Sequence, residues 1–216
     1  MQHRAARVFV LVAAALAMPG ALAVLLTGQL ELHASINRVH APWADALFAT
    51  GTHLADGWVS VGIGLALLFL RWRWFLLFAL STAGSALVAQ LLKRTIFDDH
   101  DRPSTFLAAM PDLYLVPGVE MLHHNSFPSG HSTCAFSMCF TLAVILGRRI
   151  PAALIAMLAA LLAFSRVYLS QHFTEDVLCG AFIGTATGWL AYRWLYESPF
   201  AQREWLERSL LRRQNQ

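Results

Sequence analysis

Long hydrophobic runs separated by short polar segments form the main pattern of this chain. The first run, residues 8–26, contains 19 residues and no charge, which is enough for one bilayer crossing. Later apolar runs cover residues 57–70, 74–92, 128–147, 150–170 and 174–194. The run 57–70 is short and must include neighbouring residues to span a bilayer. The pattern therefore predicts an all-α fold, a bundle of six transmembrane helices in one domain that covers residues 1–216.

The first run has a second interpretation as a secretory signal peptide. Arg4 and Arg7 precede it, and Ala21-Leu22-Ala23 offers a possible cleavage site. The run continues past that site and five more runs follow, so we expect it to be retained as a span.

Two polar segments interrupt the runs. In residues 29–56, Pro42 is followed by Trp43 and Leu47 at helical spacing, which predicts a helix that lies near the membrane interface. His33, His40 and His53 in this segment have irregular spacing and no Cys or carboxylate pattern beside them, so we expect surface histidines rather than metal ligands. Residues 95–127 contain three prolines and are expected to form an extramembrane loop.

Small residues within the apolar runs predict close packing. The segment Ala83-Gly84-Ser85-Ala86 is small enough to let two helices approach closely. Cys134, Cys139 and Cys179 lie inside apolar runs without metal-ligand spacing, so we expect them to act as small buried hydrophobic residues.

Composition and charge support a membrane protein and set its expected orientation. The chain is 57% hydrophobic and 13% charged, whereas soluble domains have about 25% charged residues. The net charge of +3 is too small to indicate nucleic-acid binding. In a six-span arrangement, 11 of the 16 Lys and Arg residues lie on the side of the termini, including Arg203, Arg208, Arg212 and Arg213 of an amphipathic tail. The positive-inside rule then predicts cytoplasmic termini in a cell (inner) membrane.

Three cations that oppose this charge bias belong to a group of polar residues on the outer face. The group contains Lys93, Arg102, Ser129, Gly130, His131, Arg166, His172 and Asp176. Taken singly, each has a simple structural explanation, such as an interface anchor, a helix start or a helix-stabilising pair. Together they lie at the outer ends of neighbouring runs, so we expect them to meet in one site.

These residue types suit the chemistry of a phosphate ester. Arg offers a planar fork to two phosphate oxygens and Lys a point charge. Free N–H groups at a helix start, here Ser129 and Gly130, favour an anion. Two histidines suit a nucleophile and a general acid near neutral pH. His172 and Asp176 are four residues apart, so a continuous helix would place them on one face, where the carboxylate orients the imidazole.

The motifs resemble those of the type 2 phosphatidic acid phosphatase (PAP2) superfamily, which shares its core with vanadium haloperoxidases. Pro-Ser-Gly-His is present as residues 128–131, and Ser-Arg-x5-His-x3-Asp as residues 165–176. The first motif, Lys-x6-Arg-Pro, is approximate because eight residues separate Lys93 from Arg102, and Arg94 could take the place of Lys93. The motif core covers residues 93–176, and the six-span layout extends the resemblance to most of the chain.

The resemblance implies a role for each residue of the group. His172 would attack phosphorus and form a phosphohistidine, with Asp176 orienting it. His131 would protonate the leaving lipid oxygen and then help to activate water. The phosphate oxygens would be held by Lys93, Arg102, Ser129, Gly130 and Arg166.

The same resemblance implies that no metal or other cofactor is needed. Asp98, Asp99 and Asp101 are the nearest approach to a carboxylate cluster, and we expect them to be a solvated loop. His123 and His124 precede the second motif and are further candidates to line the pocket.

The function expected from these features is hydrolysis of a lipid phosphomonoester or pyrophosphate taken from the bilayer. Candidate substrates are undecaprenyl pyrophosphate, phosphatidylglycerophosphate, phosphatidic acid and lipid A. A lipid phosphotransferase remains an alternative, as does a non-catalytic membrane protein that binds or transports phospholipids. The sequence leaves the substrate and the oligomeric state open. Haloperoxidase chemistry is not expected, because enzymes of that type are soluble.

Overall fold

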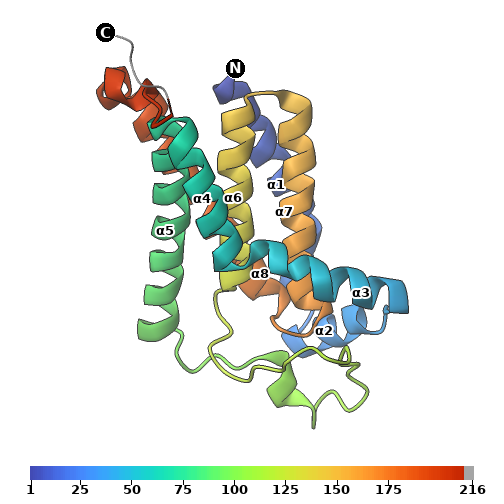
Figure 1. Cartoon of the computed structure of the whole chain (residues 1–216). Helices are drawn as coiled ribbons and strands as arrows, with labels where there is room; N and C mark the ends of the chain where they lie inside the picture. The colour runs from blue at the N-terminus through green and yellow to red at the C-terminus, as the bar shows by residue number, and fades with distance from the viewer. Residues whose placement is uncertain (212–216) are drawn as a thin grey trace.

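The computed structural model describes residues 1–211, which form an all-α bundle (Figure 1). Its α-helices are α1 (Gln2–Leu26), α2 (Gln29–Asn37), α3 (Pro42–Gly51), α4 (Gly57–Leu70), α5 (Trp72–Thr95), α6 (Gly130–Leu146), α7 (Arg149–Tyr168) and α8 (Thr174–Tyr192). Shorter turns are η1 (Thr52–Ala55), η2 (Pro103–Phe106), η3 (Arg193–Glu197), η4 (Pro199–Gln202) and η5 (Glu204–Glu207). Each of the six apolar runs is therefore helical, as is the expected interface segment at α3. Arg212 and Arg213 of the predicted tail lie outside the described residues.

The count of six spans is not reproduced by helix length and composition alone. Three helices in the described part of the chain, α1, α5 and α7, are long and apolar enough to cross a membrane. The segments Pro42–Ala55 and Gly57–Leu70 form a fourth candidate, broken by a bend of 49°. Helix α6 is apolar but has only 17 residues. It packs against α5, α7, α8 and α1, so protein surrounds it on several sides.

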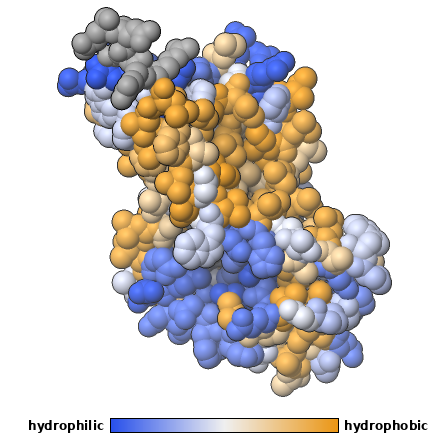
Figure 2. Space-filling model, viewed as in Figure 1, coloured by the Kyte–Doolittle hydropathy of each residue, from blue (hydrophilic) through white to orange (hydrophobic). Residues whose placement is uncertain are grey.

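The two ends of the bundle differ in character. The N-terminus and the turns η3 to η5 lie at one end, and the long loop between α5 and α6 lies at the other (Figure 1). Figure 2 shows an apolar surface over the helices and a hydrophilic surface over the loop end. This distribution is typical of a helical membrane protein with one large extramembrane loop.

Helix α1 is part of the packed bundle rather than a peripheral segment. Phe9 is fully buried and contacts the rings of Phe136 and Phe140 edge to face, with ring centroids 6.3 Å and 5.4 Å away. Ala5 and Ala6 on the same helix are also fully buried. Such aromatic packing is a large contribution to a core.

The closest helix packing is at the glycines of α8, while of the small residues of α5 that predicted close packing Ser85 is fully buried and Ala83 and Ala86 are exposed. A Cβ atom added to Gly180 would lie 2.5 Å from the carbonyl oxygen of Ser129, and Gly184 and Gly188 approach α6 just as closely. A Cβ atom on Gly84 would meet nothing within 4 Å. The glycines on α8 therefore set the position of α6, and with it the residues at the start of α6.

The cysteines differ in burial. Cys139 is buried as expected, whereas Cys134 and Cys179 are only half-buried. All three are free thiols.

Candidate active site

The nucleophile candidate lies in a tight loop between α7 and α8. Helix α7 ends at Tyr168, and the backbone N–H groups of Gln171 and His172 both donate to the carbonyl oxygen of Arg166. Ser170 adopts a left-handed backbone conformation with φ of 53°. His172 therefore precedes α8, which begins at Thr174. No continuous helix therefore carries both His172 and Asp176, in agreement with a sixth apolar run that was expected to begin at residue 174.

His172 and Asp176 nevertheless meet, because Asp176 caps the start of α8. Its Oδ2 atom accepts a hydrogen bond from the Phe173 backbone N–H at 2.9 Å and lies 3.3 Å from His172 Nδ1. The Ser126 hydroxyl donates to the same oxygen and lies 3.3 Å from His172 Nδ1. The cap thus holds the carboxylate that orients the imidazole.

The surroundings of His172 favour its neutral form. The residue is 2% exposed. Burial lowers the pKa of His172 to about 3, with a further contribution from nearby Arg102, while the hydrogen bond to Asp176 acts in the opposite direction. Nε2 lies 3.4 Å from Nη1 of Arg102. The arrangement leaves a neutral imidazole with Nε2 directed at a guanidinium group.

Gln171 positions two arginines beside this histidine. Its backbone carbonyl accepts a hydrogen bond from Arg102 Nη1 at 3.0 Å, and its side-chain oxygen accepts one from Arg166 Nη2 at 3.3 Å. Arg166 also donates from Nη1 to Thr52 Oγ1 at 2.9 Å. Nε of Arg166 is buried and has no hydrogen-bond partner among residues 1–211. This N–H group is a donor that a phosphate oxygen could accept from.

Arg102 is hydrogen-bonded to a later part of the loop between α5 and α6. Its backbone N–H donates to the carbonyl oxygen of His123 and its Nε to that of His124, at 2.8 Å and 2.9 Å. Burial lowers the pKa of Arg102 from its usual value, and Asp176 partly opposes this. The side chains of His123 and His124 are exposed, so the two residues contribute carbonyl groups to the site rather than imidazoles.

The start of α6 provides backbone N–H groups. Ser129 is the N-cap, its hydroxyl accepts a hydrogen bond from the Ser132 N–H, and its own N–H donates to the Asp176 carbonyl at 3.0 Å. A Cβ atom added to Gly130 would meet nothing within 4 Å. The backbone at Gly130 is therefore open to close approach, and free N–H groups at such a helix start suit an anion.

His131, the acid candidate, pairs with Asp56. Its Nε2 lies 2.9 Å from Oδ1 of Asp56. The second carboxylate oxygen, Oδ2, lies 2.9 Å from Nδ1 of His53. Asp56 was not among the predicted site residues, because it lies 75 residues before its partner in the chain.

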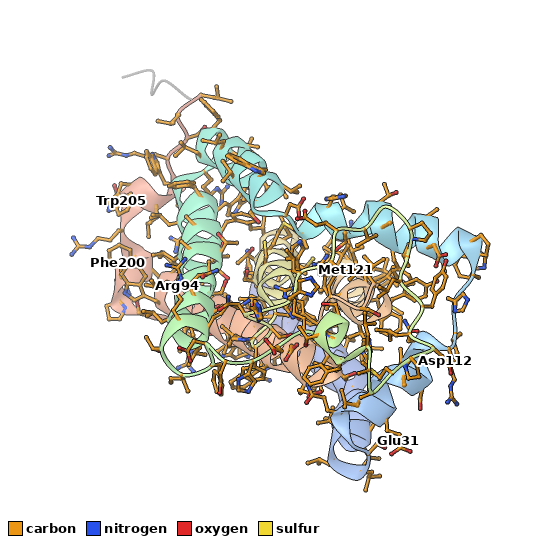
Figure 3. All side chains as sticks on the ribbon, turned by 90° about the horizontal axis from the view of Figure 1, so that it is seen from below. Glu31, Arg94, Asp112, Met121, Phe200 and Trp205 are labelled. Carbon is orange, nitrogen blue, oxygen red and sulfur yellow. The ribbon has the colours of Figure 1, made fainter. Side chains whose placement is uncertain are left out.

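Lys93, and not Arg94, faces the group. Lys93 is half-buried near the end of α5 and interacts electrostatically with Arg102, Asp176 and Arg166. Arg94 is exposed, and Figure 3 shows it on the outer side of α5, away from the labelled Met121 that lies over the middle of the bundle. The eight-residue spacing of the first motif therefore still brings Lys93 toward the arginines.

The remaining histidine candidates differ in burial. The expectation that His33 is a surface residue is wrong: it is 1% exposed, and its Nε2 lies 3.2 Å from Ser170 Oγ. The reason is that α2 packs beneath the nucleophile loop, where Asn37 also donates to Ser170 Oγ. His40 and His53 are exposed as expected. Among residues 1–211, no three His, Cys, Asp or Glu side chains are grouped to hold a metal ion.

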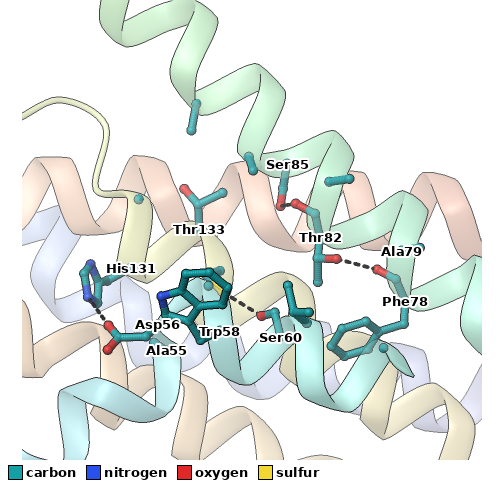
Figure 4. Close-up of a pocket in the computed structure, with 18 of the residues that line it drawn as sticks. Ala55, Asp56, Trp58, Ser60, Phe78, Ala79, Thr82, Ser85, His131 and Thr133 are labelled. Carbon is teal, nitrogen blue, oxygen red and sulfur yellow. Dashed lines mark hydrogen bonds and ion pairs between the residues drawn. The ribbon is translucent and has the colours of Figure 1, made fainter. Parts of the chain in front are cut away.

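An apolar groove of about 770 Å³ leads away from His131 between α4, α5 and α6. Asp56, Gly130 and His131 line one end, and Phe75 and Phe78 line the other, as Figure 4 shows for the labelled residues. Ala83, Ser85 and Ala86, three of the small residues that predicted helix packing, line its wall. The groove joins the polar group to the apolar middle of the bundle.

Comparisons with known proteins agree with this arrangement. A model of the PAP2 superfamily matches residues 74–200. The chain is 31% identical over 129 residues to lipid phosphate phosphatase 1 of Arabidopsis thaliana, an alignment that covers 48% of this chain and 39% of that protein. It is 36% identical over 78 residues to the lipid A 1-phosphatase of Porphyromonas gingivalis, covering 35% of this chain and 17% of that protein. The aligned part thus spans less than half the length of these two curated relatives.

A solved structure extends the likeness over most of the chain. The crystal structure of Aquifex aeolicus LpxE superposes with a TM-score of 0.67 and 28% sequence identity. The superposition covers 78% of this chain and 97% of that one.

Proposed function

This chain belongs to the PAP2 superfamily, and on that premise we propose that it is a membrane lipid phosphatase with His172 as its nucleophile. One observation carries the proposal. Nε2 of His172 lies 3.4 Å from Arg102 Nη1, while Nδ1 lies beside the Asp176 carboxylate. An oriented, neutral imidazole next to a phosphate-binding cation is the arrangement that attack on phosphorus requires.

The proposed reaction has two steps. In the first, Nε2 of His172 forms a bond to phosphorus as the bond from phosphorus to the lipid oxygen breaks, and His131 donates a proton to that oxygen. In the second, water attacks the phosphohistidine, His131 takes a proton from the water, and phosphate leaves. His131 returns to its starting state, and no step uses a metal ion.

Five residues would hold the transferred phosphoryl group. Arg102 and Arg166 offer guanidinium N–H groups, of which Nε of Arg166 is free among the described residues. Lys93 adds a positive charge, and Ser129 and Gly130 offer the N-terminus of α6. Donors placed in advance around the developing charge are a large source of rate enhancement.

A lipid substrate fits the groove beside His131. From Gln90 to Phe75, the α5 face that lines the groove is about 22 Å long at 1.5 Å per residue. An acyl or prenyl chain would lie there with its phosphate at the polar end. In the six-span topology, both termini are cytoplasmic and the loop end with the site faces the periplasm or exterior. The proposed substrates are undecaprenyl pyrophosphate, phosphatidylglycerophosphate, phosphatidic acid and lipid A.

The test is phosphate release from these four lipids by the purified protein in detergent, with His172→Ala beside it. We expect release from at least one lipid by the wild-type protein and a loss of about 10⁴-fold or more in the variant, as for removal of a catalytic nucleophile. Quenching in alkaline detergent should trap ³²P on the wild-type protein in a form that is stable to base and labile to acid. Equal release by the variant would exclude His172 as nucleophile. Release from no lipid would favour a non-catalytic binding protein, and transfer to an added lipid alcohol would identify a phosphotransferase.

A further inference from the structure

Asp56 occupies a position where its side chain is free for a role other than helix capping. It is the N-cap residue of α4, at the bend between η1 and α4. Asp at this position ordinarily accepts a hydrogen bond from the second or third N–H of the helix. The Asp56 side chain makes no such bond and turns instead toward α6 (Figure 4).

The Asp56 carboxylate lies between two imidazoles. Oδ1 is 2.9 Å from His131 Nε2, and Oδ2 is 2.9 Å from His53 Nδ1. Partial burial acts against ionisation, but the hydrogen bonds with His53 and His131 keep the pKa of Asp56 below its usual value. An ionised carboxylate can only accept, so His131 Nε2 is the donor in this pair.

We propose that Asp56 is a positioning residue that orients His131 as the acid for the leaving lipid oxygen. The inference rests on the proposed function. With Nε2–H donated to Asp56, Nδ1 is the ring nitrogen left to give and take the proton. The protein would thus use two histidine–aspartate pairs, His172 with Asp176 and His131 with Asp56, one for each side of the breaking bond.

The charges around His131 explain why such a partner is needed. Burial is the largest influence that disfavours the protonated form of His131, the charges of Arg166 and Arg102 add to it, and Asp56 acts in the opposite direction. An acid must carry its proton when the substrate binds. Since two cations of the phosphate site act against protonation, a carboxylate hydrogen-bonded to the ring offsets their repulsion.

The η1 segment that precedes Asp56 strengthens the inference. Thr52 accepts a hydrogen bond from Arg166 at the start of this segment. Ala55 packs in a small buried cluster with Ala135 and Leu162. The bend between α3 and α4 is therefore fixed against both α6 and α7, which holds the Asp56 carboxylate at a defined distance from His131.

The test compares Asp56→Asn with the wild type on two substrates with different leaving groups. Asparagine keeps the size and shape of the side chain but loses the charge. We expect kcat on a lipid phosphate to fall about 10-fold to 100-fold, less than the 10²–10⁴-fold that loss of a general acid costs. On p-nitrophenyl phosphate, whose leaving group departs without a proton, the loss should be at least fivefold smaller, because the first step then needs no acid.

Control variants separate orientation from folding. His53→Ala removes the other partner of Asp56 and should leave both rates near the wild type, while His131→Gln should show the same dependence on the leaving group as Asp56→Asn. An equal loss on both substrates, or no loss on either, overturns the proposed role of Asp56 without affecting His172 as nucleophile.

A second readout does not depend on activity. In protein with ¹³C-labelled histidine, the His131 ring should titrate at lower pH in Asp56→Asn than in the wild type, with the signal assigned by His131→Gln. An unchanged titration contradicts the inference even if the protein hydrolyses none of the lipids tested.

Discussion

Helices α8 and α6 are in close contact at Gly180. We therefore expect that one methyl group added at this position, outside the site, will greatly reduce the activity. In Gly180→Ala, the new Cβ atom would lie 2.5 Å from the Ser129 carbonyl oxygen and 3.0 Å from both Ser132 Cβ and Thr133 Oγ1. Ordinary contacts begin near 3.4 Å, so the start of α6 has to move by about 0.9 Å. The first of these contacts is with backbone, which cannot turn aside as a flexible side chain can.

The displaced residues are the ones that the proposed mechanism depends on. The Ser129 N–H is hydrogen-bonded to the Asp176 carbonyl, and Gly130 and His131 follow it. A shift of about 1 Å in catalytic geometry costs roughly 100-fold in rate. Overpacking a core lowers the free energy of unfolding by about 1–3 kcal/mol. We therefore expect Gly180→Ala to lose about 100-fold in kcat on a lipid phosphate and to melt at a lower temperature.

Gly84→Ala provides the matched control. This glycine lies within α5, and its added Cβ atom would meet nothing within 4 Å. The variant should keep full activity and gain up to about 1 kcal/mol, because Ala favours a helix over Gly. Phosphate release and thermal unfolding in the same detergent measure both effects. If Gly180→Ala keeps kcat within twofold of the wild type, the close contact does not set the position of the α6 start.

Two further predictions concern the groove and the nucleophile loop. Ala86→Phe should fill part of the groove, so KM for a long-chain lipid phosphate should rise about 10-fold while the rate on p-nitrophenyl phosphate stays unchanged; equal effects on both substrates would contradict a chain-binding groove. Burial lowers the pKa of His33 from 6.5 to about 4, so stability that is present above pH 6.5 is lost as the pH falls toward 4, by up to about 1.4 kcal/mol per pH unit. His33→Gln should flatten the fall in melting temperature over that range, and a profile that matches the wild type would refute this account.

The sequence predicted the helices well because a bilayer-length apolar run has few other structures open to it. Residues 57–70 were identified with the bounds that α4 has. Ser129 was expected to cap the helix after the loop, and it does so. Predicting which runs reach across a membrane was harder, since α6 is short and surrounded by other helices. Its apolar residues serve internal packing as much as contact with lipid.

Other residues of the site could not be predicted from the sequence, because they contact partners that are distant along the chain. Ser126 meets an oxygen of Asp176, which follows it by 50 residues, and Thr52 holds Arg166, which follows it by 114. Ser, Thr and Gln are common in loops, so nothing local distinguishes these positions. Gln171 is a partial exception. It directly precedes His172 in the sequence. Its backbone and side-chain oxygens accept from two different arginines, however, and this follows from the turn at Ser170, which the sequence does not predict.

His33 shows how a local inference failed. Residues 29–56 are mixed in polarity, and that pattern favoured a solvated segment. In the fold, α2 lies under the loop that carries His172, and His33 packs edge to face on the Phe173 ring, with centroids 5.3 Å apart. The loop contains a left-handed residue, Ser170, which costs about 1 kcal/mol or more unless other contacts support it. His33 and Asn37 provide that support, so a polar segment became buried.

The two histidine–aspartate pairs differ in the way that the proposed roles require. The side chains of His172 and Asp176 are 2% and 3% exposed, whereas those of His131 and Asp56 are 32% and 34% exposed. A nucleophile works best when it is neutral and shielded from water, because a hydration shell would have to be removed before attack. An acid that later accepts a proton from water must stay in contact with water. The first pair is four residues apart and visible in the sequence, while the second is 75 residues apart and is assembled only by the bend between α3 and α4. The difference in exposure between the two pairs is therefore a property of the fold. The motif of residues 165–176 contains the buried pair, whereas the exposed pair is not part of any one motif.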